Sequence, residues 1–207
     1  MNTALQALLS EIEQFGLAND AAHEARARRM LNITRGTGEF LAHVIASLDA
    51  RDILEVGTSN GYSTLWLADA VAASGGKVTT IEMAPDKVAM ARQNFAAAGL
   101  SHVITQREGD AGQVLADTPD GACDLVFLDS ERPAYPGWWA DLKRILRPHG
   151  VLVVDNATSH AAEMAPFVQV VSADGGFTTA LVQVGKGEFV AGRNAALARH
   201  WENWRES

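Results

Sequence analysis

The segment from Arg51 to Trp66 limits the possible fold more than any other part of the chain. It reads RDILEVGTSNGYSTLW, so a short apolar run ends in a turn from Gly57 to Gly61, and a helical pattern follows. This order is typical of a ligand-binding loop in a parallel α/β sheet, because glycine lets the backbone approach a ligand and the helix start offers free N–H groups. The loop lacks the G-x-G-x-x-G dinucleotide fingerprint, since Ser59 and Tyr62 occupy two glycine positions.

Beyond Arg51 the chain alternates apolar strand patterns with helical ones, which indicates a parallel, doubly wound sheet. We expect strands at 52–56, 78–82, 103–107, 124–128 and 150–154. We expect helices at 62–73, 86–98, 111–116, 136–146 and 161–171. Two further strands, 177–184 and 187–191, flank Gly185-Lys186-Gly187, and so short a connection makes this pair antiparallel.

The N-terminal part has helical rather than strand periodicity. We expect a first helix at 3–15 that ends at Gly16, a second at 20–31 that carries an arginine cluster, and a third that begins at Phe40 after a turn. Residues 1–49 then form a helical cap, 50–193 the α/β core and 194–207 a helical tail of one domain spanning 1–207. The tail pattern at 194–204 places Leu197, Trp201 and Trp204 on one face for packing or contact with a second subunit.

Composition narrows the class of protein. The net charge of −8, from 17 basic and 25 acidic residues, argues against nucleic-acid backbone binding as the main function. The single cysteine, Cys123, excludes an internal disulfide framework, and its apolar surroundings predict a buried position. The first 15 residues lack a signal-peptide pattern, and no apolar run is long enough to cross a bilayer. We therefore expect a soluble cytoplasmic protein without membrane or nucleic-acid partners.

Five acidic residues stand at or just past the ends of the five expected strands, at the edge of the sheet where such folds bind ligands. They are Glu55, Glu82, Asp110, Asp129 and Asp155. Carboxylates that converge in this way repel one another, and burial raises their pKa values unless cations are present. The acids therefore predict a cationic cofactor, a metal ion, or both.

The position of each acid suggests its role. Glu82 lies 21 residues after Gly61, at the end of the second strand, where an acid typically accepts hydrogen bonds from ribose hydroxyls. Asp110 suits an adenine amino group, or it is simply a helix N-cap. Asp129, Asp155 and Asn156 offer three oxygen ligands that suit magnesium, or manganese or calcium, while zinc is disfavoured. The alternative for Asp155 and Asn156 is that they only cap a turn.

These motifs together resemble a known family, in order and spacing over about residues 30–191. They are Glu55-x-Gly57-Thr58-x-x-Gly61-Tyr62-Ser63, Glu82, Gly109-Asp110-Ala111, Phe127-Leu128-Asp129 and Val153-Val154-Asp155-Asn156. The family comprises the metal-dependent, S-adenosylmethionine-dependent O-methyltransferases related to catechol and caffeoyl-CoA methyltransferases. A Rossmann-like class I methyltransferase fold with a seven-stranded, mostly parallel sheet and a final antiparallel strand is implied, as is a homodimer.

The resemblance also implies roles for individual residues. The cofactor would contact Glu55, Gly57, Thr58, Gly61, Ser63, Glu82, Met83, Asp110, Ala111 and Asp129. The divalent metal ion would be held by Asp129, Asp155 and Asn156. An acidic rim suits the sulfonium of S-adenosylmethionine, and a metal that binds both hydroxyls of a catechol lowers the pKa of the attacking oxygen. Methyl transfer then requires mainly that the two reactants are positioned.

One position departs from the family. Its members often carry lysine, a candidate base, three residues after the first metal aspartate, where this chain has Arg132. Arginine stays protonated, so Arg132 would either steady an anionic oxygen or a substrate carboxylate, or only pair with a neighbouring acid. His160 is a candidate replacement base, or an ordinary loop histidine. Asp129, Arg132 and His160 are thus the catalytic candidates.

Three functions are compatible with these residues. The first is methyl transfer from S-adenosylmethionine to a hydroxyl of a small phenolic, catechol-like acceptor with a divalent metal. The second keeps the cofactor without the metal and uses a carboxyl or amine acceptor. The third is a non-catalytic nucleotide-binding regulatory protein. Tyr135, Trp138 and Trp139 would stack on a flat acceptor or pack their helix against the sheet.

Overall fold

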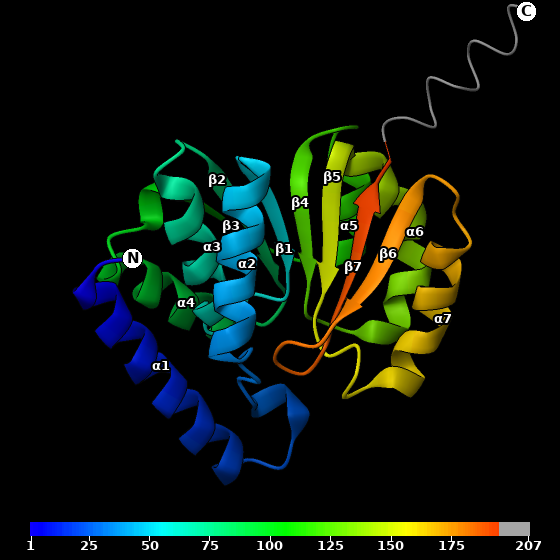
Figure 1. Cartoon of the computed structure of the whole chain (residues 1–207). Coiled ribbons are helices and arrows are strands. Elements are labelled where there is room, and N and C mark those ends of the chain that lie inside the picture. Colours follow the sequence, from blue (N-terminus) through cyan, green and yellow to red (C-terminus); the bar gives the residue numbers. More distant parts are fainter. Residues whose placement is uncertain (195–207) are drawn as a thin grey trace, which may run out of the picture.

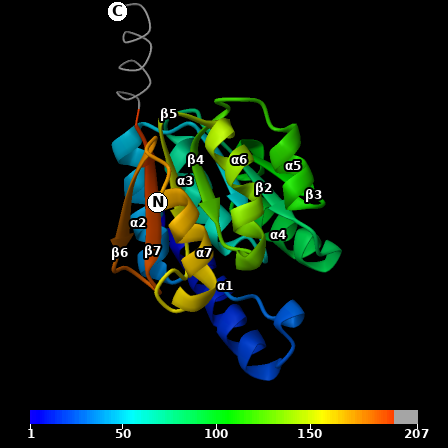
Figure 2. The same ribbon diagram turned by 90° about the vertical axis from the view of Figure 1, so that its right-hand side faces the viewer.

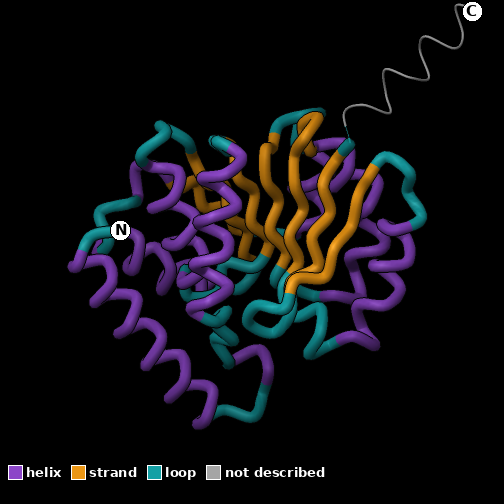
Figure 3. Tube along the Cα trace, viewed as in Figure 1, coloured by secondary structure: helices purple, strands orange, loops and turns teal. Residues whose placement is uncertain are grey.

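The centre of the protein is a seven-stranded sheet with the order β3-β2-β1-β4-β5-β7-β6 (Figures 1 and 3). We describe it from a computed structural model that places residues 1–194. The strands are β1 (Asp52–Val56), β2 (Lys77–Glu82), β3 (Ile104–Glu108), β4 (Cys123–Leu128), β5 (Leu146–Val154), β6 (Phe177–Val182) and β7 (Glu188–Arg193). β7 lies between β5 and β6 and is antiparallel to both, while the pairs formed by β1 to β5 are parallel. The expected sheet, with its one antiparallel strand, is confirmed.

Helices cover both faces of the sheet (Figures 1 and 2). The helices are α1 (Thr3–Ala22), α2 (Arg35–Leu48), α3 (Tyr62–Ala72), α4 (Pro85–Ala97), α5 (Ala111–Asp117), α6 (Tyr135–Ile145) and α7 (Ala161–Ser172). Three short 3-10 turns are η1 (Arg26–Arg28), η2 (Ser101–Val103) and η3 (Arg132–Ala134). None of the helices between residues 1 and 194 is long and apolar enough to cross a membrane. The expected helix of the tail, with Leu197, Trp201 and Trp204, lies outside the residues that the structure describes.

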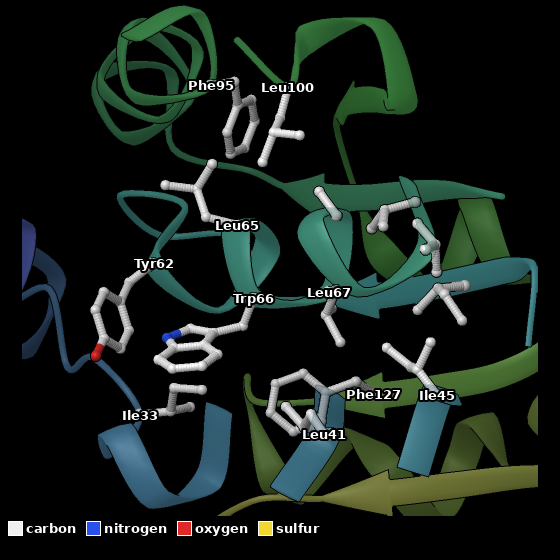
Figure 4. Packing of buried hydrophobic residues seen from close by; sticks show 14 of the residues in the cluster. Ile33, Leu41, Ile45, Tyr62, Leu65, Trp66, Leu67, Phe95, Leu100 and Phe127 are labelled. Carbon is white, nitrogen blue, oxygen red and sulfur yellow. The ribbon is translucent and has the colours of Figure 1, made fainter. Parts of the chain in front are cut away.

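Alternate residues of the central strands enter two separate cores, which explains why these strands read as continuous apolar runs. In β4, Leu125 and Phe127 face one core, and Val126 and Leu128 face the other. The first core is completed by α1, α2, α3 and α4, with aromatic side chains between α2, α3 and the sheet (Figure 4). The second is completed by α5, α6 and α7. Cys123 is buried in the second core, as expected.

The N-terminal helices differ from the sequence expectation. The first helix does not end at Gly16 but continues to Ala22, because Gly16 packs against Asn32, whose side chain would lie 2.5 Å from an added Cβ. The expected helix at 20–31 is wrong: only the short turn η1 forms there. The third helix begins at Arg35, within the expected turn, because the Thr34 hydroxyl caps it by accepting from the Thr37 N–H at 3.1 Å.

Asp20 explains why no second helix forms. Its carboxylate accepts hydrogen bonds from the N–H groups of Met30, at 2.6 Å, and Leu31, at 2.9 Å. Leu31 has a φ of 53°, which a helix does not allow. The end of α1 and the segment after it thus fold back below the carboxyl edge of the parallel strands, as Figures 1 and 2 both show.

Gly38 provides a test of the α2–α3 contact. An added Cβ would lie 2.5 Å from the buried ring of Trp66. We expect Gly38→Ala to lower the free energy of unfolding by about 1–3 kcal/mol, because a rigid ring and two helices must shift. Urea unfolding followed by circular dichroism measures this. The matched control is Gly137→Ala in α6, where an added Cβ meets nothing within 4 Å, so stability should stay equal or rise by up to about 1 kcal/mol. Equal effects of the two changes would contradict the packing described here.

Candidate active site

The glycine loop after β1 lies directly against the end of β4. Gly57 has a φ of 106°, and an added Cβ would lie 2.1 Å from the carbonyl oxygen of Asp129. The N–H groups of Gly57 and Thr58 both donate to the Ile81 carbonyl at the end of β2. Gly61 also has a positive φ, 86°, and an added Cβ would meet the Phe95 ring at 2.5 Å. Only glycine satisfies both the backbone angle and the space at these two positions.

Glu55 holds this loop from beneath. Its carboxylate is completely buried and accepts from the hydroxyls of Ser63 at 2.5 Å, Thr80 at 2.6 Å and Thr64. Burial raises the pKa of Glu55 to about 7, although the three hydroxyls oppose this shift. The bonds tie α3 to β1 and β2, so Glu55 and Ser63 have a structural role, and their contact with a cofactor stays a prediction.

Glu82 connects the end of β2 to the glycine loop. One carboxylate oxygen accepts from the Ser59 N–H at 2.8 Å, and the other accepts from the N–H groups of Met83 and Ala84, both at 3.0 Å. The Met83 side chain is exposed. Because each carboxylate oxygen has more than one lone pair, Glu82 keeps acceptor capacity for a ligand above the loop.

Asp110 caps α5, which is one of the two roles that the sequence predicted for it. Its carboxylate accepts from the Gln113 N–H at 2.9 Å, and Ala111 is the first residue of the helix. Trp138 of α6 lies next to this helix start, since a Cβ at Gly112 would be 3.0 Å from its indole nitrogen. The helix start, with its free N–H groups, faces the same edge of the sheet as the other acids.

Asp129, Asp155 and Asn156 come together as predicted. The Asn156 amide nitrogen donates to Asp129 Oδ1 at 3.1 Å and to Asp155 Oδ2 at 2.7 Å. Asn156 has a φ of 66°, which turns the chain sharply after β5. Burial of the carboxyl group, and then the nearby charge of Asp155, raise the pKa of Asp129 to about 7.

The chemistry of this trio fits a divalent cation. Asp155 is 2% exposed, and its Oδ1 atom is buried without a hydrogen-bond partner among the described residues. Two carboxylates and an amide oxygen are ligands that magnesium, manganese and calcium accept. No group of three or more His, Cys, Asp or Glu side chains within residues 1–194 is arranged to hold a metal ion, so water and a ligand would have to complete the coordination.

Glu188 was missed in the sequence. It is the first residue of β7, is completely buried, and accepts from the Thr37 hydroxyl of α2 at 2.9 Å, while Oε2 has no partner among the described residues. Burial, and then the charge of Asp155, raise its pKa to about 10. An acid between Gly187 and Phe189 in a strand pattern was the available signal.

Arg132 and His160 border the trio. Arg132 in η3 is 3% exposed, and its Nε donates to Glu163 at 3.0 Å, so it pairs with a neighbouring acid, one of the two alternatives. His160 precedes α7, and its Nδ1 lies 2.9 Å from the Ser159 hydroxyl. Partial burial, and then the charge of Arg132, lower the pKa of His160. The imidazole is therefore neutral near pH 7 and able to accept a proton.

The aromatic residues after β4 pack in the second core. Tyr135 and Trp139 are buried in the second core, where both contact the Phe167 ring. Their alternative of packing against the sheet is confirmed. The Tyr135 hydroxyl also accepts from the Ser130 N–H at 2.6 Å, which fixes the segment after Asp129.

The segment after η1 is attached to the glycine loop. The Ser59 hydroxyl donates to the Met30 carbonyl at 2.7 Å, and Lys87 Nζ donates to the Arg29 carbonyl at 2.9 Å. Met30 itself is buried. Residues 29–31 thus form a strap that the sequence did not indicate, because Ser59 and Lys87 lie far from it along the chain.

Comparison with known proteins gives this geometry a context. The sequence profile of a family described as O-methyltransferase matches residues 7–184. A catechol O-methyltransferase of Niastella koreensis is 33% identical over 129 residues, 61% of this chain and 58% of the relative. The chain therefore spans less than two thirds of that relative. A Mycobacterium avium protein, provisionally described as an O-methyltransferase, is 33% identical over 196 residues, 86% of this chain and 88% of the relative.

A solved structure extends the comparison to three dimensions. It is an O-methyltransferase of Bacillus cereus in complex with SAH, and it shares 25% sequence identity with this chain. Its TM-score is 0.75, and the match covers 91% of each chain. The helical cap and the sheet described above therefore have a counterpart of the same architecture.

Glu188 generates a test by pH. Its pKa is raised from 4.5 to about 10, so between these pH values the folded state keeps a proton that the unfolded chain releases. The free energy of unfolding of the wild type therefore falls as the pH rises from 4.5 to about 10. Glutamine cannot ionise. We expect Glu188→Gln to become more stable relative to the wild type by at least about 1 kcal/mol between pH 5 and 8.5.

Urea unfolding in EDTA at the two pH values measures this difference. The control is Glu11→Gln, an exposed residue of α1, whose effect should not change with pH. A difference between Glu188→Gln and the wild type that is the same at both pH values would contradict the buried, protonated carboxyl group.

Proposed function

Because the chain belongs to the O-methyltransferase family, we propose that it transfers the methyl group of S-adenosylmethionine to a hydroxyl of a small catechol-like phenol, assisted by a divalent cation. The observation that carries this proposal is the contact between Gly57 and the Asp129 carbonyl. It joins the glycine loop to the oxygen-ligand trio, so that a cofactor on the loop and an acceptor on the trio would be neighbours. The catechol relative and the SAH-bound neighbour support the two ligands.

The cofactor would lie along the carboxyl edge of β1, β2 and β3. The loop from Gly57 to Gly61 would cradle its methionine part, Glu82 would accept from the ribose hydroxyls, and Asp110 with Ala111 would border the adenine. Met83 is exposed next to Glu82 and would cover the nucleoside. The converging carboxylates favour a sulfonium over a neutral or anionic ligand, because the attraction between opposite charges is strong where water is excluded.

The metal ion would be held by Asp129, Asp155 and Asn156. When bound, it would lower the pKa of a coordinated phenolic hydroxyl and fix its direction of attack. The protein would contribute a partly dry site, two carboxylates and an acceptor position beside the cofactor loop. The main contribution of the site to the reaction would be to hold the two reactants at a fixed separation.

His160 would be the general base. It follows Asn156 by four residues, it is partly exposed, and its lowered pKa leaves it neutral at neutral pH. A neutral imidazole accepts a proton from an acceptor hydroxyl, whereas the guanidinium of Arg132 does not.

Removal of the cation separates the three candidate functions. We expect S-adenosylmethionine to bind in isothermal titration calorimetry with and without Mg²⁺, and methylation of a catechol to stop in EDTA and return with excess Mg²⁺. Asp155→Asn should weaken Mn²⁺ binding, measured by electron paramagnetic resonance, by about tenfold or more, because a buried ligand charge is lost, and leave S-adenosylmethionine binding within about twofold.

Two other outcomes favour the alternatives. Catechol turnover that survives EDTA would remove the metal from the mechanism and leave a metal-independent methyltransferase. Absence of cofactor binding would favour a regulatory protein without catalysis. The control for Asp155→Asn is Asp141→Asn in α6, which pairs with Arg144 away from the trio.

His160→Gln tests the base. The wild-type rate should rise with pH through the pKa of His160, which lies below 6.5, because the neutral ring is the active form. The variant should lose this rise, and its kcat should fall by about 10²-fold or more. Stopped assays between pH 5 and 8 measure both, and an unchanged rate and pH profile would dismiss the role of His160.

A further inference from the structure

We propose that the acceptor carries an anionic group, a carboxylate in the first instance, and that Arg132 and Lys186 bind it while its vicinal hydroxyls face the trio of Asp129, Asp155 and Asn156. The inference rests on the proposed function and names the substrate class of the same site. It follows from a buried guanidinium with free donors and from a lysine held at the edge of the trio.

The guanidinium of Arg132 has unused hydrogen-bond donors. Its side chain is 3% exposed, and its Nε bond to Glu163 is its one hydrogen bond to a residue between 1 and 194. The two terminal nitrogens have no such partner, although buried guanidinium groups are normally bonded on several sides. Glu163 is half exposed and uses one edge of the guanidinium, so the terminal edge remains for a ligand.

Lys186 is held beside the trio by the backbone. Its carbonyl accepts from the N–H groups of Thr158, at 3.2 Å, and Ser159, at 3.1 Å, and the Gly187 carbonyl accepts from Ala157 at 2.8 Å. The β6–β7 turn is thereby fastened to the loop that begins with Asn156. The side chain of Lys186 is exposed, and these backbone contacts place it next to the loop that follows the trio.

The charges leave an excess of positive charge once a divalent cation is bound. The two carboxylates of the trio balance the cation, and Glu163 balances Arg132. Among the described residues, Lys186 then remains as an unpaired positive charge beside the loop that begins with Asn156. This local excess stands out in a chain of net charge −8. An acceptor with one anionic group would neutralise it.

The shape of the donors favours a carboxylate. A guanidinium edge offers two parallel N–H donors that match the two oxygens of a carboxylate, while an ammonium adds a charge without fixed direction. A phosphate or sulfate ester would use the same donors, and a catechol that carries such a group distinguishes it from a carboxylate in the assay below.

A pair of acceptors that differ in one group tests the proposal. We use 3,4-dihydroxybenzoate and 3,4-dihydroxybenzamide, which have the same ring and the same vicinal hydroxyls, with 3,4-dihydroxyphenyl phosphate as the third arm. We expect kcat/KM of the wild type to favour the benzoate by about tenfold or more at low salt, and the preference to shrink as salt is added. Calorimetry of the Mg²⁺-loaded protein with each compound gives the same comparison for binding alone.

Two variants locate the preference. Lys186→Met should reduce the ratio of the two kcat/KM values, benzoate over benzamide, by about threefold to tenfold, and the ratio cancels any effect of the variant that both acceptors share. Arg132→Lys keeps the charge but loses the parallel donors, and should reduce the ratio by at least as much. The control is Lys77→Met, an exposed lysine at the opposite end of the sheet that pairs with Asp52. Because Lys186 is exposed, its variant remains informative even if the buried Arg132 variant does not fold.

The outcomes separate this inference from the proposed function. A wild type that binds and methylates the benzamide as well as the benzoate, or a ratio unchanged in Lys186→Met, overturns the anionic acceptor and leaves the methyltransferase proposal intact. Absence of methyl transfer to every compound overturns the proposed function, and the calorimetric preference then still decides whether Arg132 and Lys186 bind an anion.

Discussion

The contact between Gly57 and the carbonyl oxygen of Asp129 is the constraint on which the rest of the site depends. A side chain at position 57 would fall 2.1 Å from that oxygen, so β1 and β4 approach there as closely as backbones allow. The hydrogen bonds between β1 and β4 continue to the same point, because the Asp129 N–H donates to the Val56 carbonyl at 3.0 Å. The glycine loop and the first acid of the trio therefore cannot move independently, and the two proposed ligand sites share one backbone junction.

Buried carboxyl groups surround this junction, and their partners explain how far each pKa is shifted. Glu55 receives three hydroxyl donors and has a pKa of about 7, while Glu188 receives one and has a pKa of about 10. Hydrogen bonds to the charged form offset part of the cost of burial for Glu55, whereas the nearby charge of Asp155 adds to the cost of burial for Glu188. Hydroxyl residues of α2, α3 and β2 are thus part of the electrostatics of the site.

Much of this arrangement could be predicted from the sequence, because continuous apolar strand runs and glycine turns are local signals. The strands and the convergence of Asp129, Asp155 and Asn156 follow from the rule that parallel strands end at one edge. The end of the first helix could not be predicted, because the helix continues through Gly16 where this glycine packs against Asn32. That contact is tertiary and leaves no local signal in the sequence. Glu188 escaped for the same reason: β7 enters the sheet beside β5, and only that strand order brings the acid to Asp155.

The bond between Thr37 and Glu188 has a consequence for how the protein is made. It joins residues that are 151 positions apart, so the Thr37 hydroxyl gains this acceptor only after β7 has been synthesised. Contacts of such separation form late, because a long loop must close before they add any stability. A nascent chain that stops before β7 would have its glycine loop, but the side of the trio that faces Glu188 would be open. The order of translation therefore lets the glycine loop assemble before the surroundings of Asp155 are complete.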